Sequence, residues 1–305
     1  MIKNTTSNYT NKVTDITMSK KLKVTKVFMS NWQKKGKRLL SAFFIILLTS
    51  CGAEEEGCLD IQATNFNVSS DVACGDCCTY PTLSMRINHI KNDSLTFDLN
   101  EVYLDNSNIP FTVNSVQFYV SELELIKTNG ETATVSDQIT VTLNDNSIVD
   151  LTDNLALYTK NIGSYTEDNF GSIQTTGVFS KVRFYVGLNN PTNQTLPASV
   201  TDEHPLATQT ESMYWNATDG YIFNKIGIQT DTSDATITTY EIGTTGNQVL
   251  IELDYPISVV AGFDVALNID LDYGKLLEGI NFQSDDAATV ISKIISNTDD
   301  SFSVT

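Results

Sequence analysis

The sequence predicts an all-β protein: an antiparallel β-sandwich over residues 82–305, preceded by a small disulfide-bonded module. Three observations predict it: short runs that alternate apolar and polar residues, turn residues between these runs, and four cysteines within 21 residues. Alternation with period two is typical of half-buried strands, and repeated helical stretches that would make a parallel sheet do not separate the runs. The 305 residues, of which 41% are hydrophobic, suffice for a sizeable core.

Strands are expected where the alternating runs lie between Gly, Asn, Asp or Pro. The predicted strands are Leu83–Ile87, Val116–Val120, Leu123–Leu125, Lys181–Val186, Val249–Leu253 and Val265–Leu271. Helices are predicted only over Gly274–Phe282 and Asp285–Ser296. The Asn-rich stretch Asn189–Thr201 is predicted to be a loop.

The charge of −18 is unevenly distributed along the chain. Residues 1–50 hold 10 of the 19 Lys and Arg and one acidic residue, Asp15. The remainder therefore carries 9 basic and 36 acidic residues, a net charge of −27. Such an acidic chain excludes binding to nucleic acid through a broad basic face.

A signal peptide explains the basic N-terminus. The basic stretch Lys34–Arg38 precedes the apolar run Leu39–Leu48, which is about half the length that spans a bilayer. A basic stretch, a short apolar stretch and small residues before a cysteine are typical of an export signal. The segment Leu48–Cys51 resembles the bacterial lipobox, which implies cleavage before Cys51 and lipidation of that residue.

Residues 1–50 are therefore interpreted as the signal peptide, with translation starting at Met29 or, alternatively, at Met18. Residues 51–57 form a tether whose several acyl chains anchor the protein to a membrane. The acidic run Glu54–Glu56 resembles a signal for transfer to the cell surface in some gram-negative groups, and a plain solvated tether is the alternative. We expect a gram-negative outer membrane lipoprotein on the periplasmic face or the cell surface.

A small cysteine module is predicted over residues 58–81. An exported chain can oxidise its cysteines, and four cysteines allow three pairings. A bridge between adjacent Cys77 and Cys78 is strained, and we favour Cys58–Cys78 with Cys74–Cys77. Alternatively, Cys74, Cys77 and Cys78 bind zinc or a soft metal as thiolates.

The module resembles a short repeat that is common in secreted gram-negative surface proteins. The typical repeat has Gly-Cys-x-Asp, then Ala-x-Asn-Tyr, then Cys-x-Tyr, and the matching segments here are Gly57–Asp60, Ala63–Asn67 and Cys78–Pro81. The repeat occurs once, which suggests a spacer between the lipid and the main domain.

Motifs for catalysis are missing from the sequence. There is no Gly-x-Ser-x-Gly, no phosphate-binding loop and no dinucleotide fingerprint, and His89 and His204 are the only histidines. We therefore expect a protein that is not an enzyme.

Five segments, taken in order, resemble the MbnP-like family of copper-associated exported proteins. These segments are Leu83–His89, Phe118–Leu125, Val182–Asn189, Met213–Phe223 and Thr239–Gly243. The resemblance implies a β-rich fold, copper binding in the periplasm or at the cell surface, and a di-haem peroxidase-like partner that oxidises a tryptophan.

Carried over by position, the resemblance implies a metal site at His89, His204, Trp215 and Glu241. Glu241 stands where the family commonly has histidine, and a carboxylate is a poorer copper ligand than imidazole. Cu(I) prefers sulfur, which Met85 or Met213 could supply.

Simpler interpretations remain open for each residue. His89 would then be a surface residue at a strand end, His204 would begin a turn before Pro205, and Trp215 would anchor the core.

Calcium is an alternative cofactor. The oxygen ligands for it would come from Asp270 and Asp272, from Asp231 and Asp234, or from Asp60, Asn65, Asn67 and Asp71. The competing function is a structural or interaction lipoprotein that keeps the sandwich without a metal.

Overall fold

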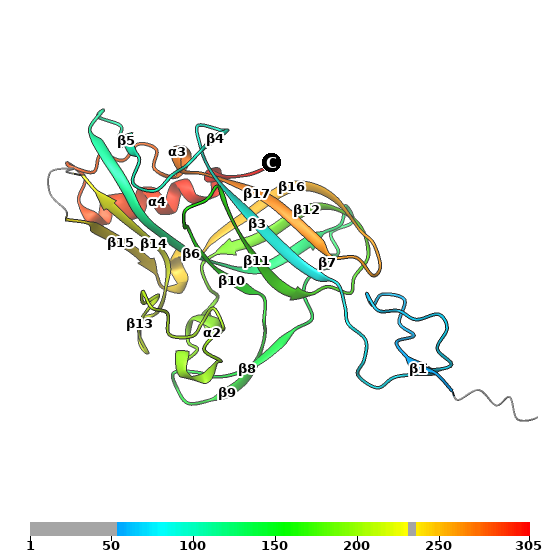
Figure 1. Ribbon diagram of the computed structural model, residues 1–305. Helices are drawn as coiled ribbons and strands as arrows, with labels where there is room; N and C mark the ends of the chain where they lie inside the picture. The colour runs from blue at the N-terminus through cyan, green and yellow to red at the C-terminus, as the bar shows by residue number, and fades with distance from the viewer. Residues whose placement is uncertain (1–53, 231–235) are drawn as a thin grey trace, which may run out of the picture. The chain divides into compact units, whose positions relative to one another are not determined.

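Two β-sheets packed on one another make up the main domain (Figure 1). The computed structural model describes residues 54–230 and 236–305. The larger sheet has the central order β13-β14-β6-β12-β16 and consists of β5 (Val102–Leu104), β6 (Pro110–Ile126), β7 (Thr132–Ala133), β10 (Leu155–Thr159), β12 (Gly177–Val186), β13 (Tyr214–Asn216), β14 (Gly220–Gln229), β15 (Thr238–Gly243) and β16 (Val249–Val259). The smaller sheet has the order β11-β3-β17-β18 and consists of β3 (Thr82–Lys91), β4 (Leu95–Thr96), β11 (Tyr165–Ser172), β17 (Val265–Asp272) and β18 (Phe302–Val304). The predicted all-β sandwich is confirmed.

Short elements complete the described chain. They are the strand pairs β1 (Glu56–Gly57) with β2 (Val72–Ala73) and β8 (Gln138–Thr142) with β9 (Ile148–Thr152), the helices α2 (Asn190–Asn193), α3 (Tyr273–Leu276) and α4 (Ala287–Ser301), and the 3-10 turns η1 (Pro197–Ser199) and η2 (Thr245–Asn247). The predicted loop Asn189–Thr201 thus contains α2 and η1, in which prolines occupy the first helical turns.

Strand β3 shows how alternation builds the core. Its alternate residues Leu83, Met85, Ile87 and His89 are all completely buried, because successive side chains of a strand point to opposite faces. The first three pack in the hydrophobic core shared with β6 and β12. His89 continues this inward face, so the expectation of a surface histidine at a strand end is wrong.

Strand β6 runs for 17 residues through two segments that the sequence predicts as separate strands. The interruption is a bulge at Glu122, whose φ of 55° is left-handed. The pairing with β12 shifts register there, between Arg183 and Tyr185. A bulge adds one residue to one strand and reverses the alternation without ending the strand. This shift explains why the pattern breaks between residues 120 and 123.

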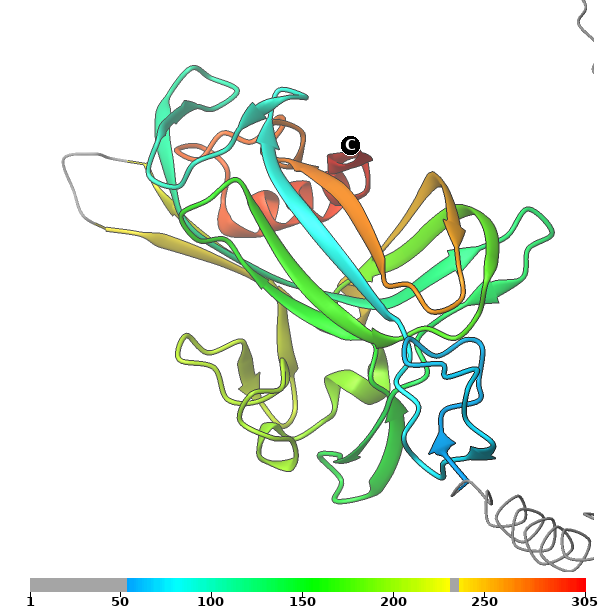
Figure 2. The ribbon, with the colours of Figure 1, turned by 45° about the vertical axis from the view of Figure 1, so that its right-hand side comes forward.

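The last long strand, β17, pairs in parallel with β3, the first long strand of the domain. The two lie side by side in both views of the ribbon (Figures 1 and 2). The other described pairings within these two sheets are antiparallel, so this contact departs from the predicted antiparallel arrangement of the sandwich. Parallel neighbours need a long crossover, which here is nearly the whole domain.

A buried carboxylate fixes the end of this strand pair. Asp272 is 1% exposed and accepts three backbone N–H groups: those of Asn92 at 3.1 Å, Asp93 at 2.7 Å and Gly274 at 2.7 Å. Asn92 and Asp93 both have left-handed φ values, which Asn and Asp tolerate better than other side chains. Asp272 therefore joins the turn after β3 to the start of α3.

Both predicted helices exist with different bounds. Helix α4 covers Ala287–Ser301, and the Asp286 side chain caps it by accepting the N–H of Thr289 at 2.7 Å. Its buried residues, among them Val290 and Ile294, recur at the four-residue spacing of a packed face. Helix α3 is only four residues long, shorter than predicted.

The cysteine module is held by the predicted disulfides, Cys58–Cys78 and Cys74–Cys77. The zinc–thiolate alternative is therefore wrong, because these sulfurs are paired with one another. Asn65 bridges the module: its Nδ2 donates to the carbonyl of Cys77 at 2.6 Å, and its Oδ1 accepts the N–H of Thr79 at 2.9 Å. Tyr80 donates its hydroxyl to Asp60 at 2.9 Å. The polar residues of the repeat thus support the module itself.

The predicted signal peptide, Met29 and Cys51 lie outside the described residues. Within the part of the chain that is described, no helix has the length and apolar character needed to cross a membrane.

We predict that Asp272→Ala lowers the free energy of unfolding by about 3 kcal/mol or more, because it leaves three N–H groups at a buried turn without an acceptor. Urea denaturation measures this loss. The exposed Asp299→Ala on α4 is the control and should change stability by less than about 0.5 kcal/mol. Equal stabilities for the two variants would contradict this role of Asp272.

Candidate functional site

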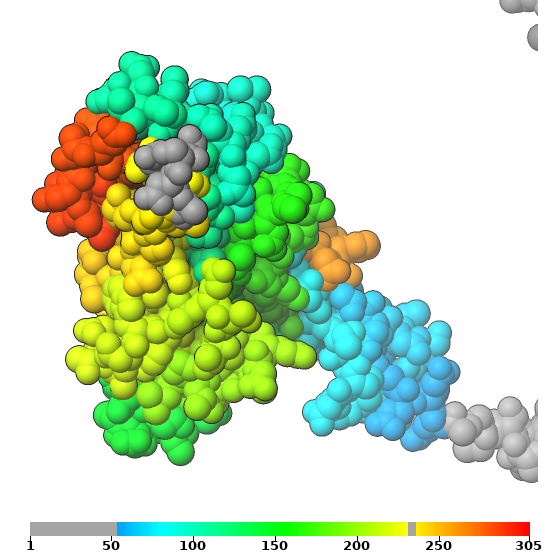
Figure 3. All heavy atoms as spheres, turned by 60° about the vertical axis from the view of Figure 1, so that its left-hand side comes forward, coloured from blue at the N-terminus to red at the C-terminus, as the bar shows by residue number. Residues whose placement is uncertain are grey.

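Trp215 and Glu241 form the one contact within the predicted metal set. The indole Nε1 of Trp215 on β13 donates to Oε2 of Glu241 on β15 at 2.7 Å. Strand β14 pairs with both strands and so carries the two residues together. Trp215 is 37% exposed, so it belongs to the surface and the expectation that it anchors the core is wrong. In Figure 3 the yellow-green and yellow segments that hold these strands share one face.

Gly243 makes room for the indole ring. A Cβ at this position would lie 2.5 Å from Cζ3 of Trp215 and 2.6 Å from the backbone oxygen of Tyr221. Both distances are too short for any side chain. The glycine that follows Glu241 and Ile242 is therefore required by the packing of Trp215 against the sheet.

Lys225 is a third member of this site, which the sequence reasoning missed. It lies directly opposite Glu241 in the β14–β15 register, and its Nζ is 3.9 Å from Oε1 of Glu241. Nζ also donates to the carbonyl of Ser212 at 3.2 Å. The carboxylate of Glu241 thus faces an indole N–H and an ammonium group, a set that holds a negative charge without a metal. Only the strand register could have revealed Lys225.

His204 lies in a turn whose position is fixed by two tyrosines. Tyr119 donates to the carbonyl of Pro205 at 2.9 Å, and Tyr221 donates to that of Leu206 at 2.7 Å. Leu206 packs with Met213 in a second hydrophobic cluster. The motif residues around His204 and Met213 therefore do come together, through packing.

Both ring nitrogens of His204 are engaged within the protein. Nδ1 accepts the N–H of Leu206 at 3.1 Å, so the neutral ring carries its proton on Nε2. Nε2 lies 3.1 Å from Oδ1 of Asp153, to which it donates. The interpretation of His204 as a turn residue agrees with these bonds.

His89 is enclosed in the core. Its Nδ1 is 2.9 Å from the hydroxyl of Tyr273, and its Nε2 is 2.9 Å from the hydroxyl of Thr166. Burial, together with the nearby Lys160 ammonium, lowers the pKa of His89 to about 3. Lys160 is itself buried and donates to the carbonyls of Asn161 and Gly163. This imidazole is therefore neutral and hydrogen-bonded on both sides.

No group of three or more His, Cys, Asp or Glu within residues 54–230 and 236–305 is arranged to hold a metal ion. Met85 and Met213 lie buried in two different hydrophobic clusters. The calcium candidates Asp60, Asn65, Asn67, Asp270 and Asp272 accept hydrogen bonds from the protein. Asp231 and Asp234 lie outside the described residues.

We predict that His89 makes stability depend on pH. Its folded pKa of about 3 lies below the value near 6.5 of an unfolded histidine. The stabilisation is complete above pH 6.5 and is lost as the pH falls toward 3, because only the unfolded chain takes up the proton. From pH 6.5 to pH 5 the wild type should lose roughly 2 kcal/mol relative to His89→Gln.

Urea denaturation of both proteins at the two pH values checks this prediction. Parallel losses in the wild type and in His89→Gln would mean that His89 ionises freely in the folded protein.

A family model described as MbnP matches residues 80–294. Among solved structures, MbnP from Methylosinus trichosporium is similar with a TM-score of 0.37 and 15% identity, over 67% of this chain and 78% of that chain. No curated protein matches the chain.

Proposed function

The chain belongs to the MbnP family, and from this premise we propose that it is a non-enzymatic, lipid-anchored interaction protein of the cell envelope. It keeps the β-sandwich and the exposed Trp215 without a copper centre built from two histidines. The lipid on Cys51 holds it at a gram-negative outer membrane, on the periplasmic face or the cell surface. A mature chain with a net charge of −27 stays soluble on its tether and is repelled by anionic lipid head groups.

The observation that carries this proposal is the bonding of the two histidines. His89 is completely buried between Tyr273 and Thr166, and both nitrogens of His204 are occupied by Leu206 and Asp153. A copper ligand must present a free nitrogen lone pair to an accessible position. The ring nitrogens of His204 and His89 are instead engaged in hydrogen bonds within the protein. The residues present therefore do not fit a copper centre built from these two histidines.

The tryptophan site supports the same proposal. At the position where the family commonly has histidine, Glu241 is neutralised by Lys225 and bonded to the indole of Trp215. An ammonium group beside the carboxylate opposes the binding of a metal cation there. The exposed indole remains as an aromatic contact for a partner, the kind of residue that anchors protein interfaces.

Copper handling is the second candidate function, and family membership favours it. The resemblance to copper-associated proteins implies copper as the ligand and a di-haem peroxidase-like protein as the partner. In that role the half-exposed Trp215 would be the residue within reach of such an oxidant.

Copper analysis of the exported full chain separates the two functions. The protein is incubated with copper, washed with a chelator and measured by elemental mass spectrometry. We predict substoichiometric copper that His204→Ala and Glu241→Gln leave unchanged, because neither residue offers a free ligand. One equivalent of retained copper that either substitution removes would contradict the proposal and establish copper handling.

A further inference from the structure

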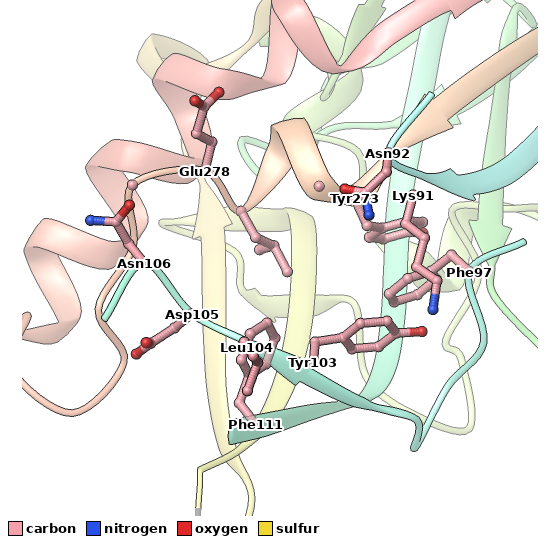
Figure 4. A pocket seen from close by; sticks show the side chains of 13 residues that line it. Lys91, Asn92, Phe97, Tyr103, Leu104, Asp105, Asn106, Phe111, Tyr273 and Glu278 are labelled. Atoms are coloured by element: carbon pink, nitrogen blue, oxygen red, sulfur yellow. The ribbon is translucent and has the colours of Figure 1, made fainter. Parts of the chain in front are cut away.

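A cavity of about 370 Å³ shares no lining residue with the site of Trp215, Lys225 and Glu241 (Figure 4). Its walls come from three segments far apart in the sequence: the end of β3 with the turn after it, the β5–β6 hairpin, and α3 with its following loop. Cavities of 300 to about 1,000 Å³ are the usual size of small-molecule sites. The volume is therefore suitable for one small organic molecule.

Aromatic rings form the body of this cavity. Phe97 stacks on Tyr273 with 3.7 Å between ring centroids and on Tyr103 with 5.1 Å, and Tyr103 contacts Phe111 at 5.9 Å. The hydroxyl of Tyr103 donates to the carbonyl of Asp98 at 2.7 Å and is thereby fixed. The rings hold one another in place, and Phe97, Phe111 and Tyr273 are at most 5% exposed. Most of the apolar surface that faces the cavity therefore comes from Tyr103, Leu104 and Leu277.

Hydrogen bonds also hold the β5–β6 hairpin in place. The N–H of Asn106 donates to the carbonyl of Ile280 at 3.2 Å, and the hydroxyl of Ser107 donates to Oδ1 of Asn281 at 2.8 Å. These bonds join the β5–β6 hairpin to the loop before α4. A ligand would thus enter a cavity whose walls need little reorganisation.

The charges around the cavity are unequal. Asp105, Asn106 and Glu278 lie on one side of the rings in Figure 4, and Lys91 lies on the other. The charge of Lys91 is neutralised by Glu101 at 2.8 Å, and its Nζ stands 4.6 Å above the Tyr103 ring. Oδ1 of Asp105 holds the turn by accepting the N–H groups of Ser107 and Ile109.

Two carboxylates at the rim of the cavity each have at least one oxygen without a partner within the described protein. In the described residues, no hydrogen bond or ion pair reaches Oδ2 of Asp105 or the carboxylate of Glu278. The rim carries net negative charge beside aromatic rings, a combination that attracts organic cations.

We propose that this cavity binds a small amphipathic amine, with its ammonium group toward Asp105 and Glu278 and its apolar body against Tyr103, Leu104 and Leu277. An anion of the same shape meets the two carboxylates and is repelled. The charge of −27 on the mature chain raises the local concentration of cations further.

Isothermal titration calorimetry of the full chain in a neutral detergent tests the proposal. Phenethylammonium is the probe, phenylacetate is its anionic match, and titrations into empty micelles are subtracted. We expect phenethylammonium to bind with a Kd of roughly 1 mM or tighter and phenylacetate to give no binding. Asp105→Asn keeps the oxygen that holds the turn and should weaken binding by about fivefold.

Asp202→Asn, which removes an equal charge from an exposed position elsewhere, is the matched control and should bind like the wild type. Binding of phenylacetate as strong as that of phenethylammonium would overturn the proposal. So would equal affinities for the Asp105→Asn and Asp202→Asn variants, or no binding of phenethylammonium to the wild type.

Discussion

The parallel pairing of β17 with β3 is the constraint on which the rest of the domain depends. It places Leu271 beside His89 and Asp272 beside Ile90. The next residue, Tyr273, therefore lies within hydrogen-bond distance of the His89 ring. Asp272 then binds the turn after β3, and Tyr273 both bonds to His89 and stacks on Phe97. The pairing of these two strands therefore buries His89 and places Tyr273 in the lining of the cavity.

Two members of the predicted metal set, His89 and Glu241, are satisfied by partners within the protein in different ways. At the end of β3, burial lowers the pKa of the His89 imidazole and keeps it neutral, and both its ring nitrogens are hydrogen-bonded within the protein. On β15, the carboxylate of Glu241 is balanced by the ammonium of Lys225 and holds the indole of Trp215. In both places an internal partner satisfies the group that a metal would need.

Much of the fold follows from local patterns in the sequence, because strand alternation and helix capping act over a few residues. The inward face of β3, helix α4 and the disulfide pairing were all predictable in this way. The bulge at Glu122 was not predictable from local patterns, because it depends on a register shift in the pairing of β6 with β12. At the candidate site, Trp215 and Glu241 lie in contact, whereas His89 and His204 each bond to other residues. The position of Lys225 opposite Glu241 depends on the register of β14 with β15, which a single sequence does not encode locally. His89 is buried because β3 continues to Lys91, beyond the predicted end of the strand at Ile87.

Histidine NMR tests most directly the claim that both imidazoles are structural groups. The chain has only two histidines, so a long-range ¹H–¹⁵N spectrum of the ¹⁵N-histidine-labelled protein assigns four ring nitrogens. We predict that the His89 signals keep a neutral, hydrogen-bonded form from about pH 7 to pH 5 and that one equivalent of Cu(II) broadens the signals of neither histidine. Titration of His89 near pH 6.5, or broadening of either histidine by Cu(II), would contradict this claim.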